Sequence, residues 1–172
     1  MKKLVLFTAM VALFGSATET FAQCDDLSDV ARFSSAAEQT IIDYKHGLMW
    51  SACAISPSSG RCMGETEVRS RMTGLQALQF AEDAQLGGHA DWRLPNLKEA
   101  LTLFGGCNDF TYQAPLQAGK YQRRIWTATL DAGLSGASLK TVTMSDGQIV
   151  PWAIKTSAAS VFLVRDVAQG AQ

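Results

Sequence analysis

The first pattern along the chain is an apolar run close to its start. Residues 4–14 are apolar apart from Thr8, and Lys2 and Lys3 precede them. Residues 15–20 are more polar, and Phe21 and Ala22 follow at the expected cleavage site. A basic start, a short apolar stretch and a cleavage site are the three parts of a secretory signal peptide. The run is shorter than the roughly 20 residues that a membrane-spanning helix needs. We therefore expect a signal peptide at residues 1–22 rather than a retained anchor.

Further along, apolar segments predict a β-hairpin. The segments Thr40–Asp43 and residues 48–50 have strand-like composition, and a turn that ends in Gly47 separates them. Two such segments joined by a glycine-containing turn are typical of adjacent antiparallel strands.

After the hairpin, two segments have apolar residues at the spacing of a helix. Thr73 and Gln76 have the spacing of a capping box, and the apolar face that follows predicts a helix over residues 73–86. Asn96 and Glu99 have the same spacing and predict the start of a second helix. The apolar stripe of this second helix closes at residues 105–106 and consists of Leu97, Leu101 and Phe104.

Short strand-like segments dominate the rest of the chain. Asp146 and Gly147 form a hairpin signal between the second and third of them. Strands at both ends of the sequence enclose two helices, which favours an α+β domain with a mostly antiparallel sheet. The predicted strands cover residues 125–130, 139–144, 149–154 and 160–167.

The chain length and the net charge limit the number of domains and the class of partner. Cleavage after Ala22 leaves residues 23–172, which is the length of one domain. Two of the fifteen basic residues and one of the sixteen acidic residues leave with the signal peptide, so the mature chain has a net charge of −2. This charge argues against nucleic acid as a partner.

The four cysteines, Cys24, Cys53, Cys62 and Cys107, all follow the cleavage site. An even number in an exported chain indicates disulfides, and three pairings are possible. Cys53 and Cys62 flank a loop rich in Ser, Pro and Gly, so we pair them and leave Cys24 with Cys107. Zinc binding is the rival reading, but the chain has no C-x-x-C. Lipid attachment to Cys24 is a further alternative, which the Gln before it disfavours.

The motifs of several enzyme classes are absent from the sequence. It contains no G-x-S-x-G and no phosphate-binding glycine motif. His46 and His89 lie in predicted turns without a recognisable partner, as solvated histidines do. Asn108 and Asp109 offer oxygen atoms to calcium, although adjacent residues of this kind are more often turn formers. We expect a protein that is not an enzyme and uses no cofactor or metal.

The sharpest basic feature is Lys120, Arg123 and Arg124, with Tyr121 and Trp126 beside them. Such a cluster can bind sulfated or carboxylated sugars. A solvated strand edge protected by charges explains it as well.

Three motifs of this chain resemble the Legionella collagen-like protein C-terminal domain family. They are G-L-M-W, which ends at Trp50, the run D-W-R-L-P-N-L-K-E at residues 91–99, and I-W-T-A-T, which contains Trp126. Trp92 and Arg93 fit a structural role within the long run, with Trp92 in the core and Arg93 in an ion pair. Pro95 completes the W-R-L-P segment, which also looks like part of formylglycine-generating enzymes; those need a reactive cysteine pair that this sequence does not suggest.

The resemblance implies a C-type-lectin-like fold and an extracytoplasmic module without known enzymatic activity. The best understood member of the family is an adhesin domain that binds sulfated glycosaminoglycans. This sequence departs from the family in two ways: its last strand lacks a cysteine, and no collagen-like region precedes the domain.

We therefore expect an exported binding module, in the periplasm, outside the cell or at the cell surface, that recognises an anionic glycan or another cell-surface polymer. The alternative is a structural or accessory protein that docks onto an envelope or appendage protein.

Overall fold

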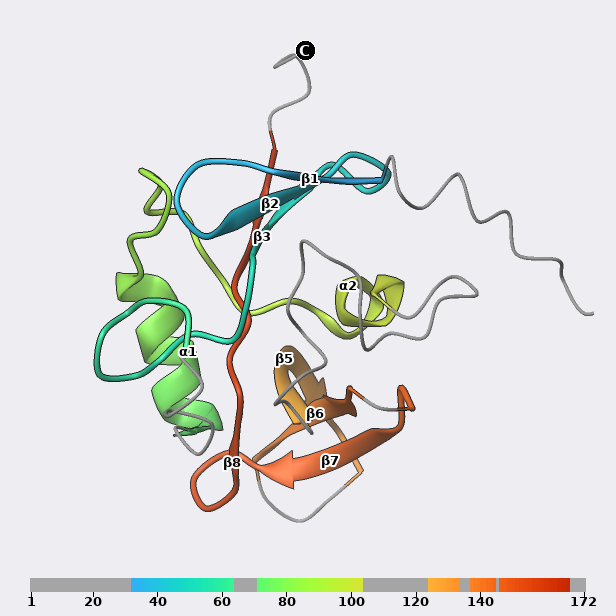
Figure 1. The fold of residues 1–172 in the computed structure, drawn as a ribbon. Helices are drawn as coiled ribbons and strands as arrows, with labels where there is room; N and C mark the ends of the chain where they lie inside the picture. Colours follow the sequence, from blue (N-terminus) through green and yellow to red (C-terminus); the bar gives the residue numbers. More distant parts are fainter. Residues whose placement is uncertain (1–31, 64–70, 104–123, 134–136, 145, 168–172) are drawn as a thin grey trace, which may run out of the picture.

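A computed structural model describes residues 32–63, 71–103, 124–133, 137–144 and 146–167 of the protein (Figure 1). Several predictions fall on residues outside these ranges. They are the signal peptide, the bridge between Cys24 and Cys107, calcium contacts at Asn108 and Asp109, the end of the second helix's apolar stripe at residues 104–106, and the basic side chains of Lys120 and Arg123.

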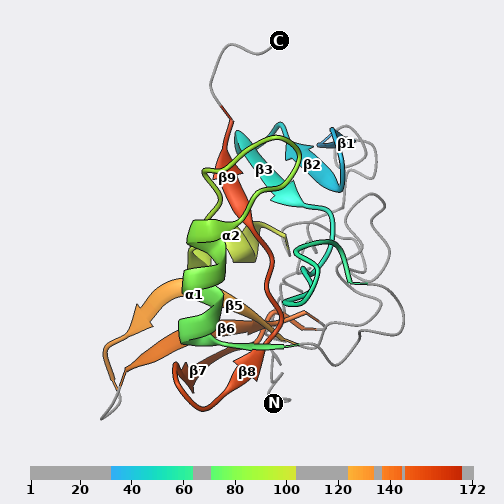
Figure 2. The ribbon, with the colours of Figure 1, turned by 90° about the vertical axis from the view of Figure 1, so that its left-hand side faces the viewer.

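A four-stranded antiparallel sheet with the strand order β1-β2-β3-β9 forms one end of the molecule (Figures 1 and 2). The predicted hairpin is confirmed, with Ile42 opposite Met49 in the register of β2 and β3. Gly47 closes the turn with a φ of 63°, which glycine adopts at low cost. The strands are β1 (Phe33–Ser35), β2 (Thr40–Asp43), β3 (Leu48–Ser51) and β9 (Val164–Asp166).

Helix α1 (Gly74–Asp83) begins as its capping box predicts and ends earlier than expected. Thr73 and Gln76 each bond to the other's backbone N–H. The predicted end at residue 86 is wrong, because Ala84 is already extended and residues 86–89 form a tight turn in which Leu86 and His89 exchange backbone hydrogen bonds. Apolar spacing continued past the true end because Leu86 is buried from that turn rather than from a helix.

Helix α2 (Leu97–Thr102) also has its predicted capping box, formed by Asn96 and Glu99. It packs against the strands β5 and β6. These belong to a three-stranded antiparallel sheet at the other end of the molecule, with a tight turn at Gly147 between β6 and β7 (Figures 1 and 2). The strands of this sheet are β5 (Arg124–Asp131), β6 (Ser138–Thr143) and β7 (Ile149–Ala153).

The C-terminal segment joins the two ends of the fold. The prediction of a single strand over residues 160–167 is wrong, because within this range only residues 164–166 form a strand, β9. The strand β8 (Ala158–Ala159) comes just before the range and pairs with β4 (Met72–Thr73), whereas β9 pairs with β3. Between β8 and β9 the chain runs through the middle of the molecule (Figure 2). An apolar run indicates burial but does not reveal that its two ends have different partners.

Two apolar clusters form the core. Trp126 belongs to the cluster that includes Ala77 of α1. Its neighbour Ile125 points to the opposite face of the same strand and belongs to the cluster that includes Ala100 of α2. The three-stranded sheet is therefore covered on both faces, and the predicted α+β class is confirmed.

Candidate functional site

Trp92 shows how the long motif shapes a neighbouring turn. Its side chain is buried, and the indole Nε1–H donates to the carbonyl oxygen atoms of Leu86 and His89, both at 3.1 Å. These carbonyls belong to residues 85–90, which follow α1 and which we call the glycine turn. Because a buried N–H with two acceptors fixes both ends of such a turn, Trp92 holds the glycine turn in place.

Arg93 connects the same motif to the rest of the fold. Its guanidinium donates to both carboxylate oxygen atoms of Glu99 at 2.8 Å and reaches Asp166 of β9 at 3.2 Å. The carbonyl of Pro95 accepts a hydrogen bond of 2.8 Å from the backbone N–H of Ala128 in β5. The motif thus joins α2 to both sheets, and its side chains serve the architecture.

A buried ion pair lies near the end of α2. Arg32 donates two hydrogen bonds to the carboxylate of Asp43, at 2.6 and 3.0 Å, and a third to the carbonyl of Thr102 at 2.8 Å. His46 Nδ1 lies 2.9 Å from Asp43 Oδ2. The prediction that His46 has no partner is therefore wrong, because the turn of the hairpin places it three residues after a buried acid.

This arrangement sets the charge of Asp43. Burial by itself would raise the pKa of Asp43, but hydrogen bonds from Arg32 and His46 outweigh it, and the pKa lies below the usual value of 3.8. A histidine oriented by a carboxylate can serve as a base only beside a nucleophile. Within the described part of the chain, no hydroxyl or thiol group bonds to His46, and the contacts of the group join the β2–β3 hairpin to the end of α2.

A polar cleft of about 700 Å³ lies where three loops meet. The loops are the β1–β2 turn (residues 36–39), the disulfide loop (residues 53–62) and the glycine turn. Such a volume is within the range of small-ligand sites. The lining residues are Glu38, Gln39, Ser59, Gly60, Arg61, Gln85, Leu86, Gly87, Gly88, His89 and Ala90.

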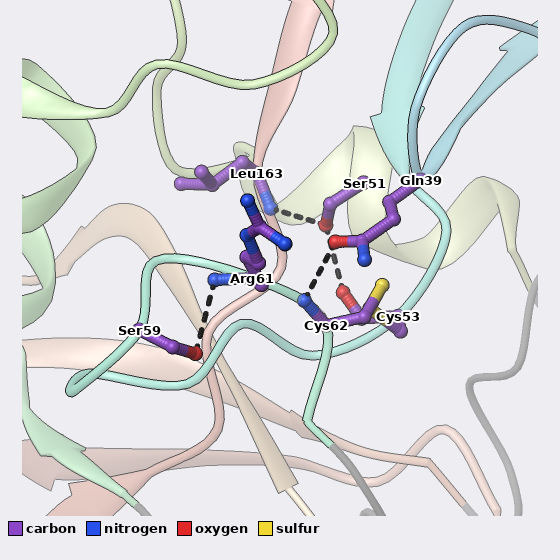
Figure 3. The surroundings of a disulfide bond; sticks show 7 residues. All are labelled: Gln39, Ser51, Cys53, Ser59, Arg61, Cys62 and Leu163. Carbon is purple, nitrogen blue, oxygen red and sulfur yellow. Dashed lines mark hydrogen bonds between the residues drawn. A yellow bond between two sulfur atoms is a disulfide. The ribbon is translucent and has the colours of Figure 1, made fainter.

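Covalent and polar contacts hold these loops together (Figure 3). The predicted disulfide between Cys53 and Cys62 is confirmed. The backbone N–H of Cys62 donates to Gln39 Oε1 at 2.9 Å, which joins the disulfide loop to the β1–β2 turn. Gly87 packs so closely against Thr40 that a Cβ would lie 2.8 Å from Thr40 Cγ2. The cleft is therefore built before any ligand arrives, which lowers the entropy cost of binding.

Backbone strain is concentrated at the cleft. Glu38 and Gln39 have φ angles of 27° and 63°, and they are the non-glycine residues with positive φ in the described part of the chain. Such conformations cost on the order of 1–3 kcal/mol each and gather at ligand sites. The side chain of Gln39 has a structural role, because its Oε1 accepts the hydrogen bond from the backbone N–H of Cys62. For Glu38, no hydrogen bond or ion pair of the carboxylate is found among the described residues.

Comparison with protein families identifies the domain. The family model of the Lcl C-terminal domain matches residues 39–165, which is well over half of the chain. The chain belongs to the Lcl C-terminal domain family. No curated protein matches the sequence.

The family match covers every residue that lines the cleft except Glu38. Sequence reasoning about this Lcl C-terminal domain missed the cleft, because its walls come from loops far apart along the chain. The available signals were adjacent Gly87 and Gly88, followed by His89 in a turn. Each is an ordinary turn signal by itself. They line a cleft only because the fold brings them to the same place as Arg61.

The structure describes one of the three basic residues that were predicted as ligand contacts in this Lcl C-terminal domain. The guanidinium of Arg124 lies over the ring of Trp152, 4.7 Å from its centroid. Trp126 is fully buried, so its ring offers no surface to a sugar, contrary to the predicted cationic and aromatic cluster. A guanidinium that stacks on an indole can still donate hydrogen bonds to an anion through the N–H groups at its edge.

The described ranges do not meet the requirements of a metal site, a reactive cysteine or a membrane-spanning helix. They contain no group of three potential metal ligands and no free cysteine. None of their helices is long and apolar enough to span a membrane.

Proposed function

We propose that this Lcl C-terminal domain is an exported binding module for glycans or a related cell-surface polymer, without catalytic activity, and that the polar cleft is its binding site. Export is supported by the signal-like residues 1–22 and by the disulfide between Cys53 and Cys62. A C-type-lectin-like fold, which the sequence resemblance implies, stays a prediction.

The observation that carries the proposal is the rigid polar cleft. Its walls offer hydroxyl, amide, imidazole and charged groups, and Leu86 is its one large apolar side chain. A hydrophilic ligand such as a carbohydrate forms hydrogen bonds to groups of these kinds. Because the loops are already joined by a disulfide and by backbone hydrogen bonds, little ordering is required on binding.

The basic segment with Lys120, Arg123 and Arg124 is the rival contact site for an anionic glycan. An accessory protein would instead dock through a flat apolar face. In the described residues, the exposed large apolar side chains are on separate elements, which favours the cleft: Tyr44, Leu75, Leu130 and Ile149.

A glycan array with secreted, mature protein at low salt tests this function. Gln85 is exposed and lines the cleft, so Gln85→Trp should fill it and lower the array signal by on the order of tenfold or more. Gln79→Trp is the matched control, because Gln79 is an exposed residue of α1 outside the cleft. It should bind like the wild type.

Two results would contradict the proposal. Signals at background for all glycans would remove glycan binding. Normal binding by Gln85→Trp, together with loss of binding when Lys120, Arg123 and Arg124 are all changed to Gln, would move the site to the basic segment.

A further inference from the structure

Two opposite charges stand at the polar cleft. Glu38 comes from the β1–β2 turn and Arg61 from the disulfide loop, and both are exposed. In the part of the chain that the structure describes, neither charged group forms an ion pair or a hydrogen bond. Their sequence neighbours Gln39 and Cys62 are joined by a hydrogen bond of 2.9 Å, so the two charges belong to adjacent parts of one rim.

Among the described residues, neither charged group contributes a contact to the fold. The Arg61 side chain extends from the disulfide loop, while its backbone N–H donates to Ser59 (Figure 3). The backbone carbonyl of Arg61 accepts a hydrogen bond from the backbone N–H of Ser56. Glu38 holds a left-handed backbone conformation that glycine would adopt at lower cost. A charged side chain in such a position fits a role outside the fold, which is contact with a ligand.

The chemistry of the remaining lining limits the ligand. Gln85, Ser59 and His89 are polar, and no Phe, Tyr or Trp ring is among the lining residues. Among the described residues, the cleft therefore has no aromatic platform on which a neutral sugar could stack. Affinity must come from hydrogen bonds and ion pairs, with a guanidinium suited to a carboxylate and a carboxylate suited to an ammonium group.

We infer that the cleft selects a carbohydrate that carries both a carboxylate and a free amino group, with Arg61 holding the carboxylate and Glu38 the ammonium group. This inference rests on the proposed function, which makes the ligand a glycan. A sugar with one charge would leave the opposite charge of the cleft without a partner, and specificity arises from that loss.

Calorimetric titration of the mature protein with muramic acid, which has both groups, tests the inference. N-acetylmuramic acid keeps the carboxylate alone, and glucosamine keeps the ammonium group alone. We expect muramic acid to bind about tenfold more tightly than either, as one charge-assisted hydrogen bond contributes. Glycylglycine, a zwitterion without a sugar ring, should bind more weakly than muramic acid.

Charge variants assign the contacts. Glu38→Gln should abolish the preference for muramic acid over N-acetylmuramic acid, and Arg61→Gln the preference over glucosamine. Glu82→Gln and Lys155→Gln are matched controls, because these exposed residues lie outside the cleft and should leave binding unchanged.

The outcomes separate the inference from the proposed function. Array glycans that bind in a manner sensitive to Gln85→Trp, without any preference for muramic acid, would overturn the inference and leave the function intact. The same holds if both charge variants bind muramic acid like the wild type. Glycylglycine that binds as tightly as muramic acid would overturn the carbohydrate class. Background signals for all sugars would remove the proposed function itself.

Discussion

Gly87→Ala tests whether the glycine turn and the β1–β2 turn form one rigid wall of the cleft. A Cβ at Gly87 would lie 2.8 Å from Thr40 Cγ2 and 3.3 Å from the carbonyl oxygen of Ala37. Its φ of 57° is also in the left-handed region. The substitution therefore introduces both backbone strain and a steric clash with the adjacent turn.

The magnitude of the effect follows from these two terms. Left-handed backbone costs an alanine about 1–2 kcal/mol, and forcing an extra methyl group into a packed contact costs a further 1–3 kcal/mol, roughly. Gly88→Ala is the matched control, because its φ is 79° but its Cβ would meet no atom within 4 Å. Its free energy of unfolding should fall only by the cost of the left-handed backbone.

Urea denaturation monitored by tryptophan fluorescence gives the free energies of unfolding. We expect Gly87→Ala to be less stable than Gly88→Ala by about 1–3 kcal/mol, with the same m-value for both. Gly87→Ala should also bind glycan more weakly, because the added methyl group pushes the β1–β2 turn away. Equal stabilities of the two variants, within about 0.5 kcal/mol, would refute the packing of these loops.

Three further predictions concern the supports of the cleft and the core. Changing Cys53 and Cys62 together to Ala should lower the free energy of unfolding in urea by about 2.6 kcal/mol, from the chain entropy of a short loop. The pKa of Asp43 is lowered in the folded state, so its contribution to stability is present above its unfolded pKa and is lost as the pH falls through the folded value. Asp43→Asn should cost about 3 kcal/mol at neutral pH, because it leaves Arg32 buried without its charge partner. It should also remove this acid dependence below the unfolded pKa of an aspartate. Trp92→Phe should cost about 1–2 kcal/mol in thermal unfolding, because the two carbonyls lose the indole donor but keep their backbone donors.

Each of these predictions has a contrary result. A variant without Cys53 and Cys62 that is as stable as the oxidised wild type would show that the disulfide loop is held by other contacts. An unchanged acid dependence in Asp43→Asn would move the responsible group elsewhere in the chain. A Trp92→Phe variant with wild-type stability would show that the indole N–H does not hold the glycine turn.

Local signals carried most of the correct predictions about the fold. The hairpin at Gly47 and the two capping boxes at Thr73 and Asn96 depend on residues at most a few positions apart, and the structure has all three. The Cys53–Cys62 bridge belongs to the same group, because the loop between them is short. Family membership followed from motifs with fixed residues and spacing.

The errors concern features that depend on distant parts of the chain. The segment before β9 is apolar except for Ser160, so its pattern could not show that β8 and β9 belong to different sheets. Asp43 lies only three residues before His46, but it also pairs with Arg32, which comes from outside the hairpin, and the local pattern did not show this buried ion pair. The cleft depends on Gln39, which links two loops by one side-chain hydrogen bond that no local pattern predicts.

The most direct test of the central claim is an NMR titration of the isotope-labelled mature protein with the glycan that gives the strongest array signal. We predict that the largest amide shifts are at Gln39, at Arg61 and in the glycine turn, which come from three distant parts of the sequence. Shifts confined to Arg124 and the β5–β6–β7 sheet, with the three cleft loops unchanged, would contradict the assignment of the cleft as the binding site.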